Sequence, residues 1–224
     1  STKDVNKGES NEYIAWDTSN VTNMSSMFKN ARVFNQTLNL WNVSSVTNMN
    51  SMLAGAKTFN QPLNSWDVSS VTNMESMFHN VSSFNQPLNS WDVSSVTSMK
   101  NMFAGTKNFN QNISTKDVNK GESNEYIAWD VSNVTNMFDM FTDAESFNQP
   151  LNWNVSNVTI MNRMFLRASN FNQNLRKWEV NGSCDTTDMF SKCPVNTTPY
   201  YNLRAKDAPN LDEQYFNYPK DHTY

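Results

Sequence analysis

Residues 66–90 read WDVSSVTNMESMFHNVSSFNQPLNS, and from Trp91 the same pattern begins again as WDVSSVTSMKNMFAGTKNFNQNIS. All 13 methionines keep the same register, mostly as M-x-x-M-F, and Phe-Asn-Gln recurs after them. The tryptophans mark the period, with spacings of 25, 25, 25, 38, 24 and 25 residues: Trp16, Trp41, Trp66, Trp91, Trp129, Trp153 and Trp178. Self-similarity at a fixed period of this size indicates a repeat architecture.

Each repeat contains the parts of a strand and of a helical turn. Segment 63–71, LNSWDVSSV, approximates the L-x-x-L-x-L spacing that gives a leucine-rich repeat one short strand. Met74, Met77 and Phe78 follow at i, i+3 and i+4, which is one apolar stripe of a helix. The sequence therefore predicts a leucine-rich-repeat-like solenoid of about seven to eight turns, each with a short parallel strand and a short helical turn.

The large apolar side chains are expected to form the core by stacking between turns, because no single repeat can bury its own apolar face. The expected core ladder consists of the seven tryptophans together with Met49, Met52, Met74, Met77, Phe59 and Phe84. Their regular return matters more than the overall composition, which is polar, with 38% hydrophobic residues and a mean hydropathy of −0.67.

A polar pair also recurs in every full repeat. An Asn-Gln dipeptide follows each repeated phenylalanine, beginning at Asn35, Asn60, Asn85, Asn110, Asn148 and Asn172. We interpret these residues as an amide ladder that satisfies backbone groups in the turns, since buried backbone N–H and C=O groups must be paired. A strip that binds a glycan or another ligand is the alternative.

The 38-residue spacing marks an insertion of 13 residues near 116–128. Lys116 stands where the repeat has Trp, and residues 114–130 repeat residues 1–17 without a change. Insertions in repeat proteins usually lie on one face, often the binding face. Lys116, Asn119, Lys120 and Glu122 are therefore candidate contact residues, and an inherited structural variant without a binding role is the alternative.

The repeats define a solenoid domain over 1–195, followed by a tyrosine-rich tail over 196–224. The tail is either a flexible end or a segment that docks on a partner. Cys184 and Cys193 lie near the last repeat and are compatible with one local disulfide or with two thiols. The printed N-terminus has no signal-peptide pattern, so such a peptide was removed or the chain is an internal piece.

Charge and hydropathy exclude several partners. A net charge of −4, a pI near 5.2 and the lack of a basic cluster argue against nucleic-acid binding. No apolar run reaches 18 residues, so we expect no membrane span.

No pattern of catalytic residues, cofactor site or metal site emerges. The histidines are His79 and His222, and the glycines are scattered, so no phosphate-binding loop is expected. Acidic residues after Trp form a column at Asp17, Asp67, Asp92 and Asp130. Calcium along this column is conceivable, although Asn42 and Asn154 interrupt it.

The recurring string W-[DN]-V-S-x-V-T-x-M-x-x-M-F-x-x-A-x-x-F-N-Q-x-L resembles the BspA-like leucine-rich repeat surface proteins, over roughly residues 13–195. This resemblance implies a secreted or surface-anchored solenoid without catalytic residues. We therefore expect an extracellular or cell-surface adhesion and protein-interaction module that binds protein or glycan on another surface. The alternative is a structural subunit that polymerises head to tail with copies of itself, since open heterologous contacts produce filaments.

Overall fold

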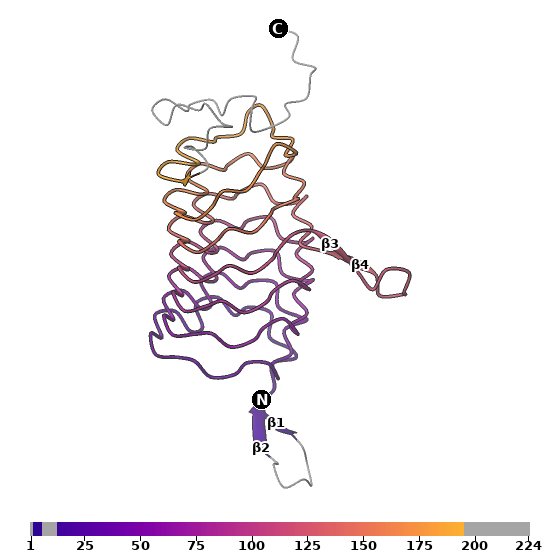
Figure 1. Cartoon of the computed structure of the whole chain (residues 1–224). Helices are drawn as coiled ribbons and strands as arrows, with labels where there is room; N and C mark the ends of the chain where they lie inside the picture. Colours follow the sequence, from indigo (N-terminus) through magenta and orange to yellow (C-terminus); the bar gives the residue numbers. More distant parts are fainter. Residues whose placement is uncertain (1, 6–12, 195–224) are drawn as a thin grey trace.

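The computed structural model describes residues 2–5 and 13–194, and side-chain burial from residue 16 onward. The tail expected at 196–224 lies outside the described residues. Figure 1 shows the described chain as a column of similar coils, one above another. Neighbouring coils meet at isolated parallel β-bridges that form one continuous ladder: Asn23, Asn48, Asn73, Ser98, Asn136, Ile160 and Asp185. Each coil thus lies directly on its neighbour.

Backbone hydrogen bonds between coils extend well beyond the bridges. In the coil at 74–80, the N–H groups of Ser76 and Phe78 donate to Lys100 O and Met102 O of the next coil, at 2.8 and 3.0 Å. Met77 N–H instead donates within its own coil, to Met74 O at 3.2 Å. Alternate N–H groups therefore join the coils, and those between them close local turns.

No helix forms in the described part of the chain, although each M-x-x-M-F segment was expected to make a helical turn. Two residues per segment have positive φ, four positions apart, such as Ser76 at 56° and Asn80 at 57°. A left-handed residue every four positions interrupts an α-helix and turns alternate N–H groups toward the neighbouring coil. The expected strand is likewise reduced to a single bridge residue per coil.

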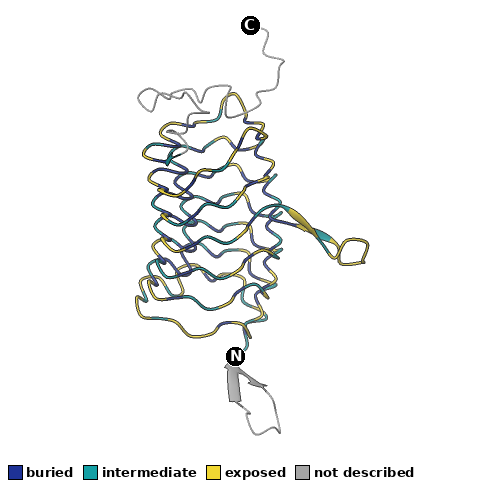
Figure 2. Ribbon diagram, in the orientation of Figure 1, coloured by how far each residue is buried: buried dark blue, intermediate teal, exposed yellow. Residues whose placement is uncertain are grey.

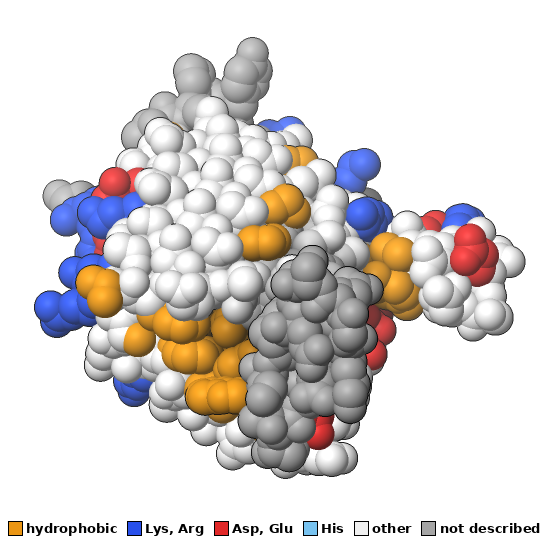
Figure 3. Space-filling model, turned by 90° about the horizontal axis from the view of Figure 1, so that it is seen from below, with side chains coloured by type: hydrophobic (Ala, Val, Ile, Leu, Met, Phe, Trp, Pro, Cys, Tyr) orange, Lys and Arg blue, Asp and Glu red, His pale blue; other side chains and the backbone are white. Residues whose placement is uncertain are grey.

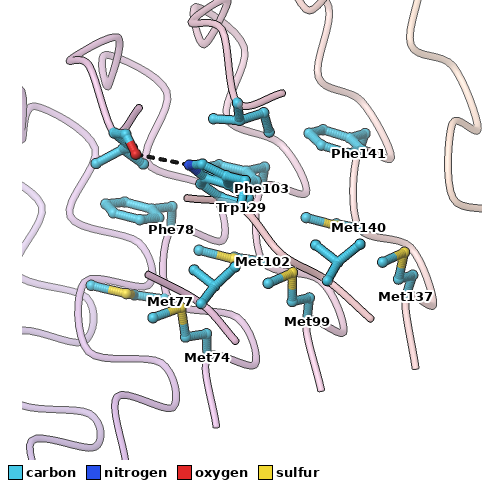
Figure 4. Packing of buried hydrophobic residues seen from close by; sticks show 14 of the residues in the cluster. Met74, Met77, Phe78, Met99, Met102, Phe103, Trp129, Met137, Met140 and Phe141 are labelled. Carbon is cyan, nitrogen blue, oxygen red and sulfur yellow. Dashed lines mark hydrogen bonds between the residues drawn. The ribbon is translucent and has the colours of Figure 1, made fainter. Parts of the chain in front are cut away.

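Buried residues recur in coil after coil along the column (Figure 2). The expected core residues Met49, Met52, Met74, Met77, Phe59 and Phe84 are all fully buried. Figure 4 shows equivalent methionines and phenylalanines of successive coils lying in rows. Rings in one row lie 5.4–5.7 Å apart: Phe78, Phe103, Phe141, Phe165 and Phe190. A second row has spacings of 5.8–6.1 Å: Phe34, Phe59, Phe84, Phe109, Phe147 and Phe171.

The tryptophans add a polar connection between coils. Trp91 Nε1–H donates to Leu63 O at 3.0 Å, and Trp129 Nε1–H donates to Leu88 O at 2.8 Å (Figure 4). The same bond to the Leu or Ile that opens the preceding coil is made by Trp66, Trp153 and Trp178. Each buried indole N–H thus has the partner that burial requires.

The first coil departs from this pattern. Trp16 is 63% exposed and Trp41 is only partly buried, although both belong to the expected core ladder. The two indoles stack on each other at 5.9 Å. Trp16 begins the first described coil, so no other described coil lies on its far side.

The regular strands belong to two hairpins. β1 (Thr2–Val5) pairs antiparallel with β2 (Tyr13–Trp16), and β3 (Lys116–Val118) pairs antiparallel with β4 (Tyr126–Ala128). The register is the same in both, with Lys3 opposite Ala15 and Lys116 opposite Ala128. The duplicated sequence thus forms the same hairpin twice.

The insertion leaves the stack of coils intact. The β3–β4 hairpin projects from the side of the column, and the ladder continues past it from Ser98 to Asn136. The rings of Phe103 and Phe141 on either side lie 5.7 Å apart, as in coils without an insertion.

Gly105 provides a test of the left-handed turns. It has a φ of 69°, and a Cβ there would overlap the Asn80 side chain, whereas Gly121 at the hairpin tip has a φ of 85° and open space around it. We expect Gly105→Ala to lower the free energy of unfolding by about 2–4 kcal/mol, from backbone strain plus steric overlap. Gly121→Ala should cost about 1 kcal/mol or less from strain alone. Chemical denaturation measures both, and equal losses would contradict the close approach of Asn80.

Candidate interaction site: the inserted hairpin and the groove beneath it

The inserted hairpin carries the candidate contact residues on an exposed projection. Lys116, Asn119, Lys120 and Glu122 are all exposed, and Ile127 on β4 is 46% exposed. Lys120 Nζ forms an ion pair with Asp117 Oδ2 at 2.6 Å. Near the tip, Gly121 N–H donates to Glu125 Oε2 at 2.9 Å. The projection thus offers one large apolar side chain among charged and amide groups.

The base of the hairpin is fixed to the coils on both sides. Tyr126 Oη–H donates to Ser90 O at 2.5 Å, and Trp129 N–H donates to Trp91 O at 3.0 Å. On the other side, Thr115 N–H donates to Asn152 Oδ1 at 2.7 Å. These bonds hold the hairpin at a defined angle, so the surface around it is preorganised.

A groove of about 340 Å³ lies between the hairpin and the two coils that precede it. Its lining comprises segment 64–69, then Ser90 and Asp92, then Asn124 and Tyr126 from the hairpin. Two of these residues are acidic and none is Lys or Arg. The groove is therefore a polar, negatively charged hollow with an aromatic side chain at its edge.

The groove carboxylates affect Tyr126. Partial burial raises the pKa of the Tyr126 phenol, and the negative charges of Asp92 and Asp67 raise this pKa further. A raised pKa keeps the phenol protonated, which preserves its hydrogen bond to Ser90 O. The influence of both carboxylates on one hydroxyl indicates that their fields overlap in the groove.

The column of aspartates caps turns in the structure. Asp67 Oδ1 accepts from Ser69 N–H at 3.1 Å and from Ser69 Oγ–H at 2.6 Å. Asp92 makes the same pair of bonds with Ser94. Over the described residues, no three or more His, Cys, Asp or Glu side chains gather so as to hold a metal ion. Nor does the described part contain a helix long and apolar enough to cross a membrane.

The repeated asparagines connect consecutive coils. Asn85 Oδ1 accepts from Asn110 N–H and from Gln111 Nε2–H, both at 2.9 Å. The same backbone bond links Asn35 to Asn60, Asn60 to Asn85, Asn110 to Asn148 and Asn148 to Asn172. The side-chain oxygens of the first five asparagines, Asn35 to Asn148, thus each accept a hydrogen bond from the next coil.

The two cysteines do not form the disulfide considered from the sequence. Cys193 is buried, and its Sγ lies 3.3 Å from Phe171 O inside the core. Cys184 is partly exposed, and its Sγ lies 3.9 Å from Asp185 O. Burial, with the nearby charge of Asp185, raises the pKa of the Cys184 thiol to about 12.

Sequence reasoning overlooked the groove because its parts are distant in the chain. Tyr126 lies near the end of the insertion, and nothing in the repeat pattern sets it apart. A second overlooked feature is Phe138, which stands between two methionines where other repeats have polar residues. Its ring has Lys100 Nζ and Arg163 Cζ each 5.5 Å from the centroid. The aromatic residue at an otherwise polar position is the signal that could have revealed this second site.

The chain matches one protein family. Residues 2–116 and 118–202 match the family described as Mycoplasma protein of unknown function, DUF285. The chain belongs to this family. Comparison of the DUF285 chain with curated proteins and with solved structures finds no match. The family description assigns no activity, so the function must be argued from the residues.

The amide ladder can be tested at Asn85. We expect Asn85→Ala to lower the free energy of unfolding by about 1–3 kcal/mol, because the N–H of Asn110 loses its acceptor and Gln111 Nε2–H keeps only its bond to Asn85 O, at 3.1 Å. Asn85→Asp keeps an oxygen acceptor and should lose less than half as much at pH 7. Thermal or chemical denaturation of the two variants gives the comparison, and similar losses would contradict the acceptor role.

Cys184 should react slowly in the folded protein. With a pKa of about 12, on the order of one in ten thousand of its thiols is ionised at pH 8, and the thiolate is the reactive form. We expect iodoacetamide to leave Cys184 largely unmodified at pH 8 in the native state and to modify it readily after denaturation. Peptide mass spectrometry over time measures both rates. Equal rates in the two states would contradict the effect of burial.

Proposed function

We propose that this DUF285 chain is an extracellular or cell-surface adhesion and protein-interaction module, built as a leucine-rich-repeat-like solenoid of the BspA-like kind. Its contact surface is the inserted hairpin together with the groove beneath it. The observation that carries this proposal is the groove of about 340 Å³ between an anchored projecting hairpin and two stacked coils. The surface placement rests on the resemblance of the repeat motif.

The groove chemistry favours a basic side chain of a protein partner. The described hydrogen bonds use only Oδ1 of Asp67 and of Asp92. The second oxygen of each carboxylate therefore remains available to a Lys or Arg head group. Tyr126 adds an aromatic ring near the same position, and a cation close to an aromatic face gains further attraction.

The hairpin would extend the contact beyond the groove. Ile127 supplies an apolar side chain, and the amides of Asn119 and Asn124 can bond to a partner backbone. Because both ends of the hairpin are bonded to coils, little ordering is needed when a partner binds. A glycan is the other candidate partner, since aromatic and amide groups also suit sugars.

A structural subunit that polymerises head to tail is the second candidate function. The exposed apolar side chains of the first coil favour it, since an end contact would bury them. At the other end, however, Trp178 is 1% exposed and Phe190 is 3% exposed, so these large apolar side chains of the last described coil are already buried. This difference between the ends makes the interaction module the stronger proposal.

The groove can be tested with a small cationic probe. We expect the peptide acetyl-Gly-Lys-Gly-amide to shift the backbone NMR signals of Ser69, Ser90 and Tyr126 in a saturable way. The same peptide with an acetylated lysine should cause no such shifts, because its charge is removed. The double variant Asp67→Asn, Asp92→Asn should lose the response.

Asp130→Asn is the matched control, because Asp130 has the same place in its repeat and lies outside the groove lining. This variant should respond to the lysine peptide as the unaltered chain does. If a neutral N-acetylglucosamine trimer shifts these NMR signals and the lysine peptide does not, the partner is a glycan and not a protein. Unchanged binding in the double variant would overturn the assignment of the groove.

A further inference from the structure

The N-terminal end of the column exposes four large apolar side chains, of which Trp16 and Met27 stand at positions that later coils bury. Trp16 is 63% exposed, Met27 is 41%, Val33 is 88% and Leu40 is 45%. Figure 3 views this end, where hydrophobic side chains form a patch beside the grey atoms and most charged side chains lie at the margins. The position of Met27 is fully buried one coil further on, at Met52, whereas the positions of Val33 and Leu40 stay exposed there, at Thr58 and Ser65. The internal hairpin shows which segment covers the equivalent face within the column.

The internal hairpin provides the comparison, because residues 114–130 and 1–17 are identical in sequence. Trp129 in the internal copy corresponds to Trp16 in the N-terminal copy. Trp129 is fully buried, and its indole stacks on Trp153 at 6.0 Å, as Trp16 stacks on Trp41 at 5.9 Å. The two indoles therefore face the next coil in the same way and differ in what lies on their other side.

On that other side, the coil at 88–113 covers Trp129. Leu88 O accepts from Trp129 Nε1–H at 2.8 Å, and Trp91 O accepts from Trp129 N–H at 3.0 Å. Phe103 also approaches the indole, with centroids 6.4 Å apart. For Trp16, no described residue accepts from the indole N–H. The N-terminal copy thus has the same donor and the same apolar ring without a coil against them.

We propose that the N-terminal face is a docking surface for one more coil of the same repeat, placed against Trp16 as the coil ending at Ile113 is placed against Trp129. Such a coil would place a Leu carbonyl against the Trp16 indole N–H and would cover Trp16 and Met27. The internal copy shows that this arrangement permits stacking, because the coil ending at Ile113 directly precedes β3.

A second copy of the chain is a poorer occupant. In its last described coil the large apolar side chains of Trp178, Met189 and Phe190 are 1–3% exposed, so they are already buried. Its inner coils already have neighbours on both sides. A separate coil of the repeat meets neither obstacle.

A fusion tests the proposal directly. In this fusion, a copy of residues 88–113 is placed immediately before Ser1. The copied Leu88 then precedes Trp16 by the same number of residues as Leu88 precedes Trp129. Labelling with 5-fluorotryptophan, with Trp16→Phe used to assign the signal, reports solvent access at this indole. We expect the acrylamide quenching and the solvent isotope shift of Trp16 to fall several-fold, toward those of Trp129.

A second fusion with residues 63–113 supplies the added coil with a neighbour of its own, in case one coil alone does not order. The matched control fusion carries Ser in place of the copied Met99, Met102 and Phe103, and it should leave Trp16 accessible. Accessible Trp16 in both intact fusions would overturn the proposal. So would protection of Trp16 in the unfused chain that grows with concentration together with a dimer in sedimentation, because a second copy would then be the occupant.

Discussion

The fold depends on left-handed residues placed four positions apart in every coil. Ser76 and Asn80 in one coil have this conformation, as do Asn101 and Gly105 in the next. With this geometry, alternate N–H groups point to the neighbouring coil, where carbonyl groups accept them. An α-helix would keep those hydrogen bonds within the segment and leave none to join the coils. The connection between coils therefore comes first, and the rows of Met and Phe follow from it because equivalent side chains then lie above one another.

Stacking by the backbone also explains how the chain accommodates an insertion. The hairpin leaves the column after Thr115 and returns at Trp129, where Thr115 Oγ–H donates to Trp129 O at 3.0 Å. Both ends of the insertion are thus adjacent, and the coil closes as if the extra residues were absent. Because the ladder continues from Ser98 to Asn136, the core needs no adjustment. A repeat fold of this kind can gain a projecting surface without losing buried contacts.

The sequence was sufficient to identify which residues share a position and insufficient to give their conformation. The spacing of Trp, Met and Phe correctly identified most of the buried side chains, because burial repeats with the period. The stripe formed by Met74, Met77 and Phe78 suggested a helical turn, but local periodicity does not show whether Ser76 has positive or negative φ. That choice is made by hydrogen bonds to the next coil, such as the bond from Ser76 N–H to Lys100 O, whose acceptor lies 24 residues further along the sequence. The groove was missed for a related reason, since Asp67, Asp92 and Tyr126 come together only after stacking.

The duplicated segment separates the effect of sequence from that of environment. The same residues form a hairpin with the same register in both places, so local sequence is enough to specify the hairpin. Burial of its tryptophan is different, because Trp129 is fully buried and Trp16 is 63% exposed. The acidic groove follows the same rule, since its carboxylates belong to the two coils before the internal hairpin. A hairpin without two preceding coils lacks Asp67 and Asp92 beneath it, so the groove is a property of where the hairpin is inserted.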